Sequence, residues 1–180
     1  MKLLVLLSLL IFLVYLVLVI RYVGAVPESL SETYYLLGNK YYKLHSDPSG
    51  MSFRRLRASI FTAMMWTIAL LLMIPLLELT PELGKPLVFL SLGAIMFVGA
   101  APQFHDEMEG KVHTTAAIMA AIFGIAWAVL FAEGLYWLLV SAFGCLVAAF
   151  VTGTIKSSRT YWLEMVAFAT VYVSAAIMIF

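Results

Sequence analysis

The sequence predicts an all-α membrane protein, a single-domain bundle of six transmembrane helices over residues 1–180. Three observations support this. Of the 180 residues, 64% are hydrophobic and only 12% are charged, whereas a soluble domain has about 45–50% apolar and about 25% charged residues. Six apolar runs approach the roughly 20 residues that a helix needs to cross the hydrocarbon layer. Basic residues gather in alternate connections between these runs. A soluble enzyme is therefore excluded, and the net charge of +1 excludes a nucleic-acid binder that relies on a basic field.

The predicted spans are continuous apolar runs, unlike the alternating strands of about 10 residues in a membrane barrel. The first is longer than the core of a signal peptide, about 7–15 residues, so we expect it to stay as a helix. A polar loop, residues 24–57, follows it. The six spans cover residues 3–23, 58–77, 87–103, 113–132, 135–152 and 161–180.

The distribution of Lys and Arg predicts the orientation. Nine of the eleven basic residues lie at the first, third and fifth connections, namely Arg21, Lys40, Lys43, Arg54, Arg55, Arg57, Lys111, Lys156 and Arg159. Loops rich in Lys and Arg stay in the cytoplasm. We therefore expect a multi-pass protein of the inner (plasma) membrane, with the 24–57 loop cytoplasmic and both termini on the non-cytoplasmic side.

The first loop contains a helix-start pattern. In the motif Ser29-Leu30-Ser31-Glu32, Ser29 and Glu32 have the spacing of a capping box. In a capping box, the side chain of each of these residues accepts a hydrogen bond from the backbone N–H of the other. The pattern predicts a short helix over residues 33–37, ended by Gly38.

Small residues predict how two of the helices pack. They recur every fourth position in the fourth span, as Ala116, Ala120, Gly124 and Ala128, and again in the fifth span around Gly144. Small residues let helix backbones approach closely in a membrane. We therefore expect the fourth and fifth spans to form a tight antiparallel hairpin packed through these two rows.

The third connection contains the densest group of polar residues. His105, Asp106 and His113 lie within it or beside it, and a folded loop could bring them together. His45, the remaining histidine, falls on the same predicted side of the membrane. Imidazole nitrogens and carboxylate oxygens are common zinc ligands. A zinc ion held by His45, His105 and His113 would generate hydroxide for attack on an ester or amide.

Three further residues are candidate catalytic groups: Ser31, Asp106 and Glu164. Glu164 lies three residues into the last predicted span, where an ionisable group is costly and commonly functional. A carboxylate in the first turn of a helix is also favoured by the helix dipole alone, so both interpretations stay open. The middle of every predicted span lacks charged residues, which argues against an ion pore or a proton relay.

Two short motifs carry a family resemblance: Ser29-Leu30-Ser31-Glu32-Thr33 after the first span, and Gly99-Ala100-Ala101-Pro102 followed by Asp106 and His113. Through them the chain resembles a family of small bacterial six-helix membrane proteins without assigned activity. That family is similar in turn to the alkaline-ceramidase-like (CREST) hydrolases, which use zinc, three His, an Asp and a Ser. The resemblance implies site roles for Ser31, Asp106 and His113. The last span departs from it by lacking the His-x-x-x-His pair of those hydrolases.

Three functions follow as expectations. The first is a non-catalytic scaffold, a lipid-binding or a partner-binding component, favoured by the absence of charge at depth. The alternative is a zinc-dependent hydrolase of a lipid amide or ester, with its site at the cytoplasmic face. A further alternative is a small transporter. The expected partners are membrane lipids and a second copy of the chain, with no nucleic acid.

Overall fold

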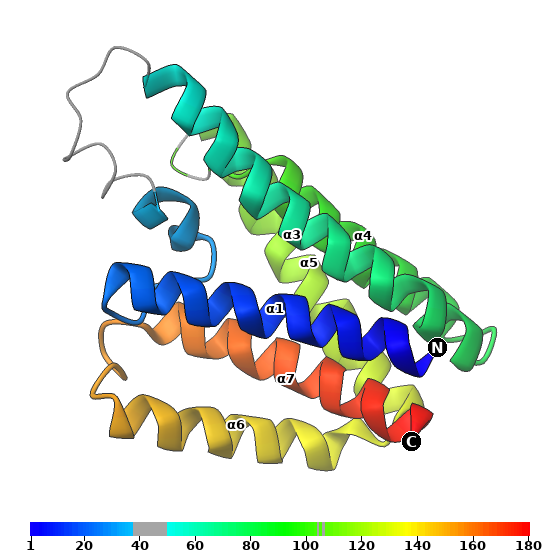
Figure 1. The fold of residues 1–180 in the computed structure, drawn as a ribbon. Helices are drawn as coiled ribbons and strands as arrows, with labels where there is room; N and C mark the ends of the chain where they lie inside the picture. Colours follow the sequence, from blue (N-terminus) through cyan, green and yellow to red (C-terminus); the bar gives the residue numbers. More distant parts are fainter. Residues whose placement is uncertain (38–49, 104, 106) are drawn as a thin grey trace.

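The computed structural model describes residues 1–37, 50–103, 105 and 107–180, which are helical and contain no strand (Figure 1). Residues 32–37 form a short helix, which agrees with the helix-start pattern, while Gly38 lies outside the described residues. The long helices are α1 (Lys2–Val23), α3 (Gly50–Leu79), α4 (Lys85–Ala100), α5 (Glu107–Phe131), α6 (Gly134–Val151) and α7 (Arg159–Ile179).

The predicted membrane helices are confirmed as a class. Five of the described helices, α1, α3, α5, α6 and α7, are long and apolar enough to cross a membrane. The third predicted span is the exception, because α4 has only 16 residues and ends at Ala100 rather than at residue 103. Ala101 leaves the helical conformation, with φ −114° and ψ 64°, since the residue before a proline is disfavoured in the α region.

Two helices begin more than a turn earlier than predicted, whereas the starts of the others agree within about two residues. α3 starts at Gly50, so residues 50–57 of the predicted loop are helical, and α5 starts at Glu107 instead of residue 113. Both extensions are polar sequences that hydropathy alone assigns to loops. Glu107 and Glu109 occupy the first turn of α5, where carboxylates are favoured by the helix dipole.

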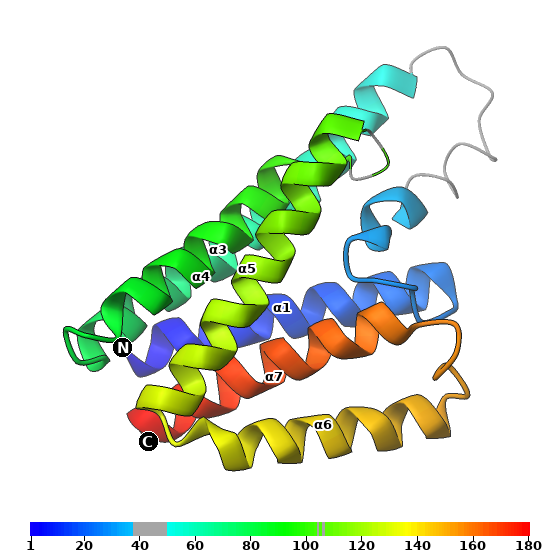
Figure 2. The same cartoon turned by 180° about the vertical axis from the view of Figure 1, so that it is seen from behind.

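The helices run up and down, so that the helix ends next to the first, third and fifth connections lie at one end of the bundle and the chain termini lie at the other (Figure 1). The Nζ atom of Lys2 lies 4.6 Å from the ring centroid of Phe180. α3, α4 and α5 pack together, α1 lies beside α7, and α6 packs mainly on α7 (Figures 1 and 2). The helix ends that flank the basic connections of the sequence therefore lie together at a single end, called here the connection end.

At the connection end, α5 and α7 diverge (Figure 2). The segment that follows α1, residues 24–37, lies there between the group of α3, α4 and α5 and the pair of α1 and α7. Hydrogen bonds hold this segment against α7. The Tyr161 N–H donates to the carbonyl of Glu28 over 2.9 Å, and the Ser158 hydroxyl donates to the carbonyl of Val26 over 3.3 Å. The segment is therefore part of the packed bundle.

The predicted pairing of the two rows of small residues is wrong at Gly124 and Gly144, although α5 and α6 are in contact. A Cβ on Gly124 of α5 would lie 2.9 Å from Ser91 Oγ on α4 and 3.1 Å from Val171 Cγ2 on α7. A Cβ on Gly144 of α6 would have no neighbour within 4 Å. Gly124 thus serves the crossing with α4 and α7, while Ala128 of the same row lies against Gly134 at the start of α6, a division that sequence spacing cannot reveal.

Hydrogen bonds between buried polar side chains tie distant helices together. The Ser8 hydroxyl of α1 donates to the carbonyl of Ile68 on α3 over 3.2 Å and lies 2.7 Å from the Tyr172 hydroxyl of α7. The Trp127 indole N–H donates to Thr80 Oγ1 over 2.9 Å. Such contacts stabilise helix association where lipid removes the hydrophobic driving force.

Candidate functional site

A serine and a histidine from distant parts of the sequence meet at the connection end. Ser31 Oγ lies 2.6 Å from Nε2 of His113, and the two residues are only 5% and 4% exposed. Nδ1 of His113 lies 2.7 Å from the carbonyl oxygen of Ala101. A carbonyl oxygen can only accept, so in the neutral imidazole Nδ1 carries the hydrogen and Nε2 accepts the hydroxyl proton of Ser31. A nucleophile and its general base are paired in this way.

The turn that carries Ser31 is fixed on both sides. The Leu30 N–H donates to Oε2 of Glu164 over 2.6 Å, and the Thr33 hydroxyl donates to the carbonyl of Leu30 over 2.5 Å. Thr33 Oγ1 also lies 2.7 Å from the Tyr15 hydroxyl of α1. Contacts with α1 and α7 therefore set the position of Ser31.

The capping box forms in part. The Glu32 N–H donates to Ser29 Oγ over 3.0 Å, as the spacing predicts. The Glu32 carboxylate instead lies 3.6 Å from Nε2 of His105. The side chain that would complete the box is thus turned toward the third connection.

Glu164 lies on the second turn of α7, where its carboxylate accepts the Leu30 N–H. It lines the same open cavity as Ser31 and His113. This hydrogen bond joins Glu164 to the backbone of the turn that carries Ser31. A direct catalytic role for Glu164 stays a prediction.

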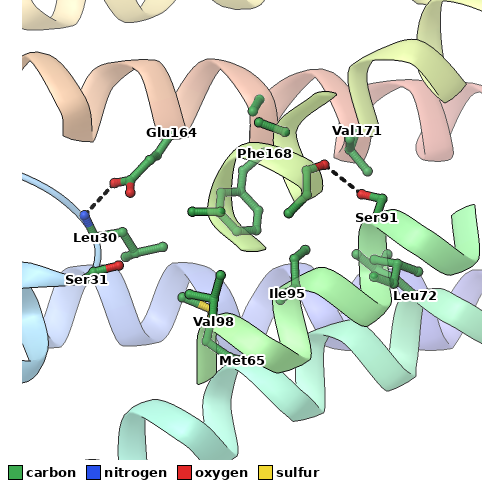
Figure 3. A pocket seen from close by; sticks show the side chains of 15 residues that line it. Leu30, Ser31, Met65, Leu72, Ser91, Ile95, Val98, Glu164, Phe168 and Val171 are labelled. Atoms are coloured by element: carbon green, nitrogen blue, oxygen red, sulfur yellow. Dashed lines mark hydrogen bonds between the residues drawn. The ribbon is translucent and has the colours of Figure 1, made fainter. Parts of the chain in front are cut away.

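Two cavities meet at Ser31. The first, of about 490 Å³, is open and is lined by Ser31, His113 and Glu164 together with Glu32 and His105. The second, of about 70 Å³, extends into the bundle among apolar side chains of α3, α4, α5 and α7 (Figure 3). Ser31 and Glu164 line both cavities. The hydroxyl of Ser31 therefore lies where a polar entrance joins an apolar interior.

The rim of the open cavity contains an ionisable pair. His105 is exposed, its backbone N–H donates to the Tyr35 hydroxyl over 3.1 Å, and its ring stacks obliquely on Tyr35 with centroids 4.4 Å apart. Partial burial raises the pKa of the Glu32 carboxyl above its ordinary value of 4.5, and the neighbouring His105 offsets part of this rise. Protonation of the Glu32 carboxylate would change the charge at the entrance.

The structure brings together three of the six predicted site residues, Ser31, His113 and Glu164, with His105 at the rim. His45 and Asp106 lie outside the described residues. Within the described part of the chain, no group of three or more His, Cys, Asp or Glu residues could hold a metal ion. Both ring nitrogens of His113 make hydrogen bonds to protein atoms. The zinc site stays a prediction.

The sequence does not reveal that Ser31 and His113 are partners. It indicates Ser31 as a catalytic group and His113 as a metal ligand, although both fall at the same end of the bundle and in the motifs of the resemblance. Those two facts together could have indicated the pair. The Ala101 carbonyl that orients His113, and the Tyr15 hydroxyl that supports Thr33, have no sequence signal of their own.

No protein-family model, curated protein or solved structure matches the chain. The resemblance to the bacterial six-helix family therefore stays an expectation.

Proposed function

We propose that this protein is a membrane-embedded serine hydrolase that cleaves an ester or amide bond of a lipid. Ser31 is the nucleophile and His113 is the general base. The observation that supports this most directly is the 2.6 Å contact between Ser31 Oγ and Nε2 of His113, in the tautomer set by the Ala101 carbonyl. A general base in this position contributes about 10²–10⁴-fold to a rate.

The reaction proceeds in two halves. Ser31 Oγ attacks the carbonyl carbon of the lipid while its proton passes to Nε2 of His113. His113 then gives that proton to the departing alcohol or amine, which leaves an acyl group on Ser31. A water molecule, deprotonated by His113, attacks this acyl group, and the fatty acid leaves as the proton returns to Ser31. Throughout, the Ala101 carbonyl accepts the Nδ1 hydrogen and steadies the imidazolium.

A lipid substrate fits the surroundings of the pair. The open cavity lies between α5 and α7, and two apolar residues on its border, Ile118 and Leu163, are 53% and 71% exposed. Such residues face hydrocarbon when the bundle spans a membrane. A lipid can therefore reach Ser31 sideways from the bilayer, with its polar group toward the connection end.

Covalent labelling tests the nucleophile. The purified protein in detergent should react with an alkyl fluorophosphonate, and peptide mass spectrometry should locate the adduct on Ser31. Ser31→Ala should abolish labelling. Ser157→Ala, which changes an exposed serine at the same end, should leave it intact.

A non-catalytic lipid-binding component is the second candidate, favoured by the apolar cavity beside Ser31. It predicts a different result in the same experiment. A folded protein that binds lipid but forms no adduct on Ser31 would contradict the hydrolase and support this candidate.

We also propose that all six long helices span the inner membrane, with the connection end in the cytoplasm and both termini outside. α4 is about 24 Å long at 1.5 Å per residue, which is shorter than the roughly 30 Å hydrocarbon layer. Local thinning of the bilayer around α4 accommodates this mismatch. Reporter domains inserted at Lys156, in the exposed fifth connection, and fused after Phe180 should lie in the cytoplasm and outside it, respectively. Both reporters on one side would contradict this topology.

A further inference from the structure

We propose that the acyl chain of the substrate occupies the inner cavity beside Ser31, and that the floor of this cavity restricts the enzyme to short and medium chains. The inference rests on the proposed hydrolase function and adds the class of acyl group. It is carried by the shape and lining of the cavity of about 70 Å³.

The cavity is polar at the Ser31 end and apolar along its length. Figure 3 shows Ser31 and Glu164 at one end, and Met65, Ile95 and Phe168 between this end and the other. The far end contains Ser91, whose hydroxyl donates to the carbonyl of Ala120 over 2.8 Å. This hydroxyl therefore has its partner, and the lining favours a hydrocarbon chain over a polar ligand.

The floor of the cavity is formed where three helices cross. Ser91 of α4 and Val171 of α7 line the far end, and Gly124 of α5 packs against both. The approach is so close that a Cβ on Gly124 would lie 2.9 Å from Ser91 Oγ and 3.1 Å from Val171 Cγ2. An acyl chain that reaches this crossing cannot extend farther along the bundle.

The depth follows from the helix geometry. Glu164 and Val171 lie seven positions apart on α7, about 10 Å along its axis at 1.5 Å per residue. A volume of about 70 Å³ over this length leaves room for no more than one hydrocarbon chain. Flexible walls such as Met65 can adjust to a chain. A long saturated chain would exceed the depth, and its end would collide with Val171.

Chain-length profiles test the floor. Hydrolysis of the p-nitrophenyl esters of butyrate, octanoate, dodecanoate and palmitate should show a steep fall in kcat/KM after octanoate. Val171→Ala should raise the ratio of the dodecanoate rate to the octanoate rate by about 10-fold, as expected for added room in a hydrophobic pocket. Val173→Ala makes the same change on α7 at a residue that does not line the cavity, and should leave the ratio unchanged.

Photochemical crosslinking gives a readout that needs no turnover. Decanoic acid with a diazirine at its terminal carbon should label Leu72, Ser91 or Val171 in the Ser31→Ala protein, and unlabelled decanoate should compete. Labelling confined to lipid-facing residues such as Leu163 would overturn the inference. An active enzyme in which Val171→Ala leaves the ratio of the dodecanoate rate to the octanoate rate unchanged would also overturn it. A labelled floor in a protein that cleaves no ester would instead contradict the hydrolase and leave the acyl site standing.

Discussion

Replacing Ser31 with alanine is expected to lower kcat/KM for ester hydrolysis by about 10³-fold or more, because the nucleophile is lost while the fold is kept. His113→Asn should have a comparable effect, since the amide can still donate to the Ala101 carbonyl but cannot accept the proton of Ser31. Initial rates of octanoate ester hydrolysis, measured for purified protein in detergent, check both values.

The double variant separates catalysis from unrelated damage. Residues that act as one unit lose activity together, so Ser31→Ala combined with His113→Asn should be no slower than the slower single variant. If the losses of kcat/KM from the two single variants multiplied in the double variant, the two residues would act independently. Ser157→Ala serves as the control at an exposed serine, and thermal unfolding should show that every variant remains folded. Activity of Ser31→Ala within about twofold of the parent protein would contradict the assignment.

The fold class could be predicted because hydrocarbon imposes a simple rule on sequence. Long apolar runs must be helices, since each unpaired backbone group in lipid costs several kcal/mol. The rule fails at helix ends, where it does not distinguish a polar helix from a loop. The polar start of α5 at Glu107 and the early end of α4 at Ala100 are both boundaries of this kind.

The candidate site could be predicted in its members but not in its pairing. Ser31, His113 and Glu164 stood out because each is polar and close to a predicted membrane boundary. Their roles depend on which atoms meet, and that is set by the turn at Leu30 and by a backbone carbonyl at Ala101. Hydropathy and spacing contain no information about either contact.

The same limit explains why small residues misled the packing prediction. Gly124 and Gly144 have similar surroundings in sequence, and only the crossing of α4, α5 and α7 shows that the first is enclosed and the second is not. The consequences of a glycine substitution must therefore be derived from the space around each position.

Gly134→Ala is expected to destabilise the bundle by about 1–3 kcal/mol, the usual cost of an extra methyl group in a packed site. Gly134 opens α6 directly after Glu133, which adopts the left-handed conformation with φ 50°. A Cβ at Gly134 would lie 2.6 Å from both the carbonyl carbon and the carbonyl oxygen of Ala128. These are backbone atoms inside α5, so no side-chain rotation can relieve the contact. Unfolding by sodium dodecyl sulfate in mixed micelles, followed by circular dichroism, measures the change.

Gly144→Ala is the matched control, because it adds the same methyl group to the same helix where nothing lies within 4 Å. Alanine favours the helical conformation over glycine by about 0.8–1.0 kcal/mol, so this variant should be as stable as the parent or slightly more so. If both substitutions lowered the free energy of unfolding equally, the contact between Gly134 and Ala128 would not be the cause. The exposed face of α6 that contains Gly144 would then pack against another molecule, such as a second copy of the chain. Destabilisation by Gly134→Ala alone would show that the close approach of Gly134 to Ala128 sets the angle between α5 and α6.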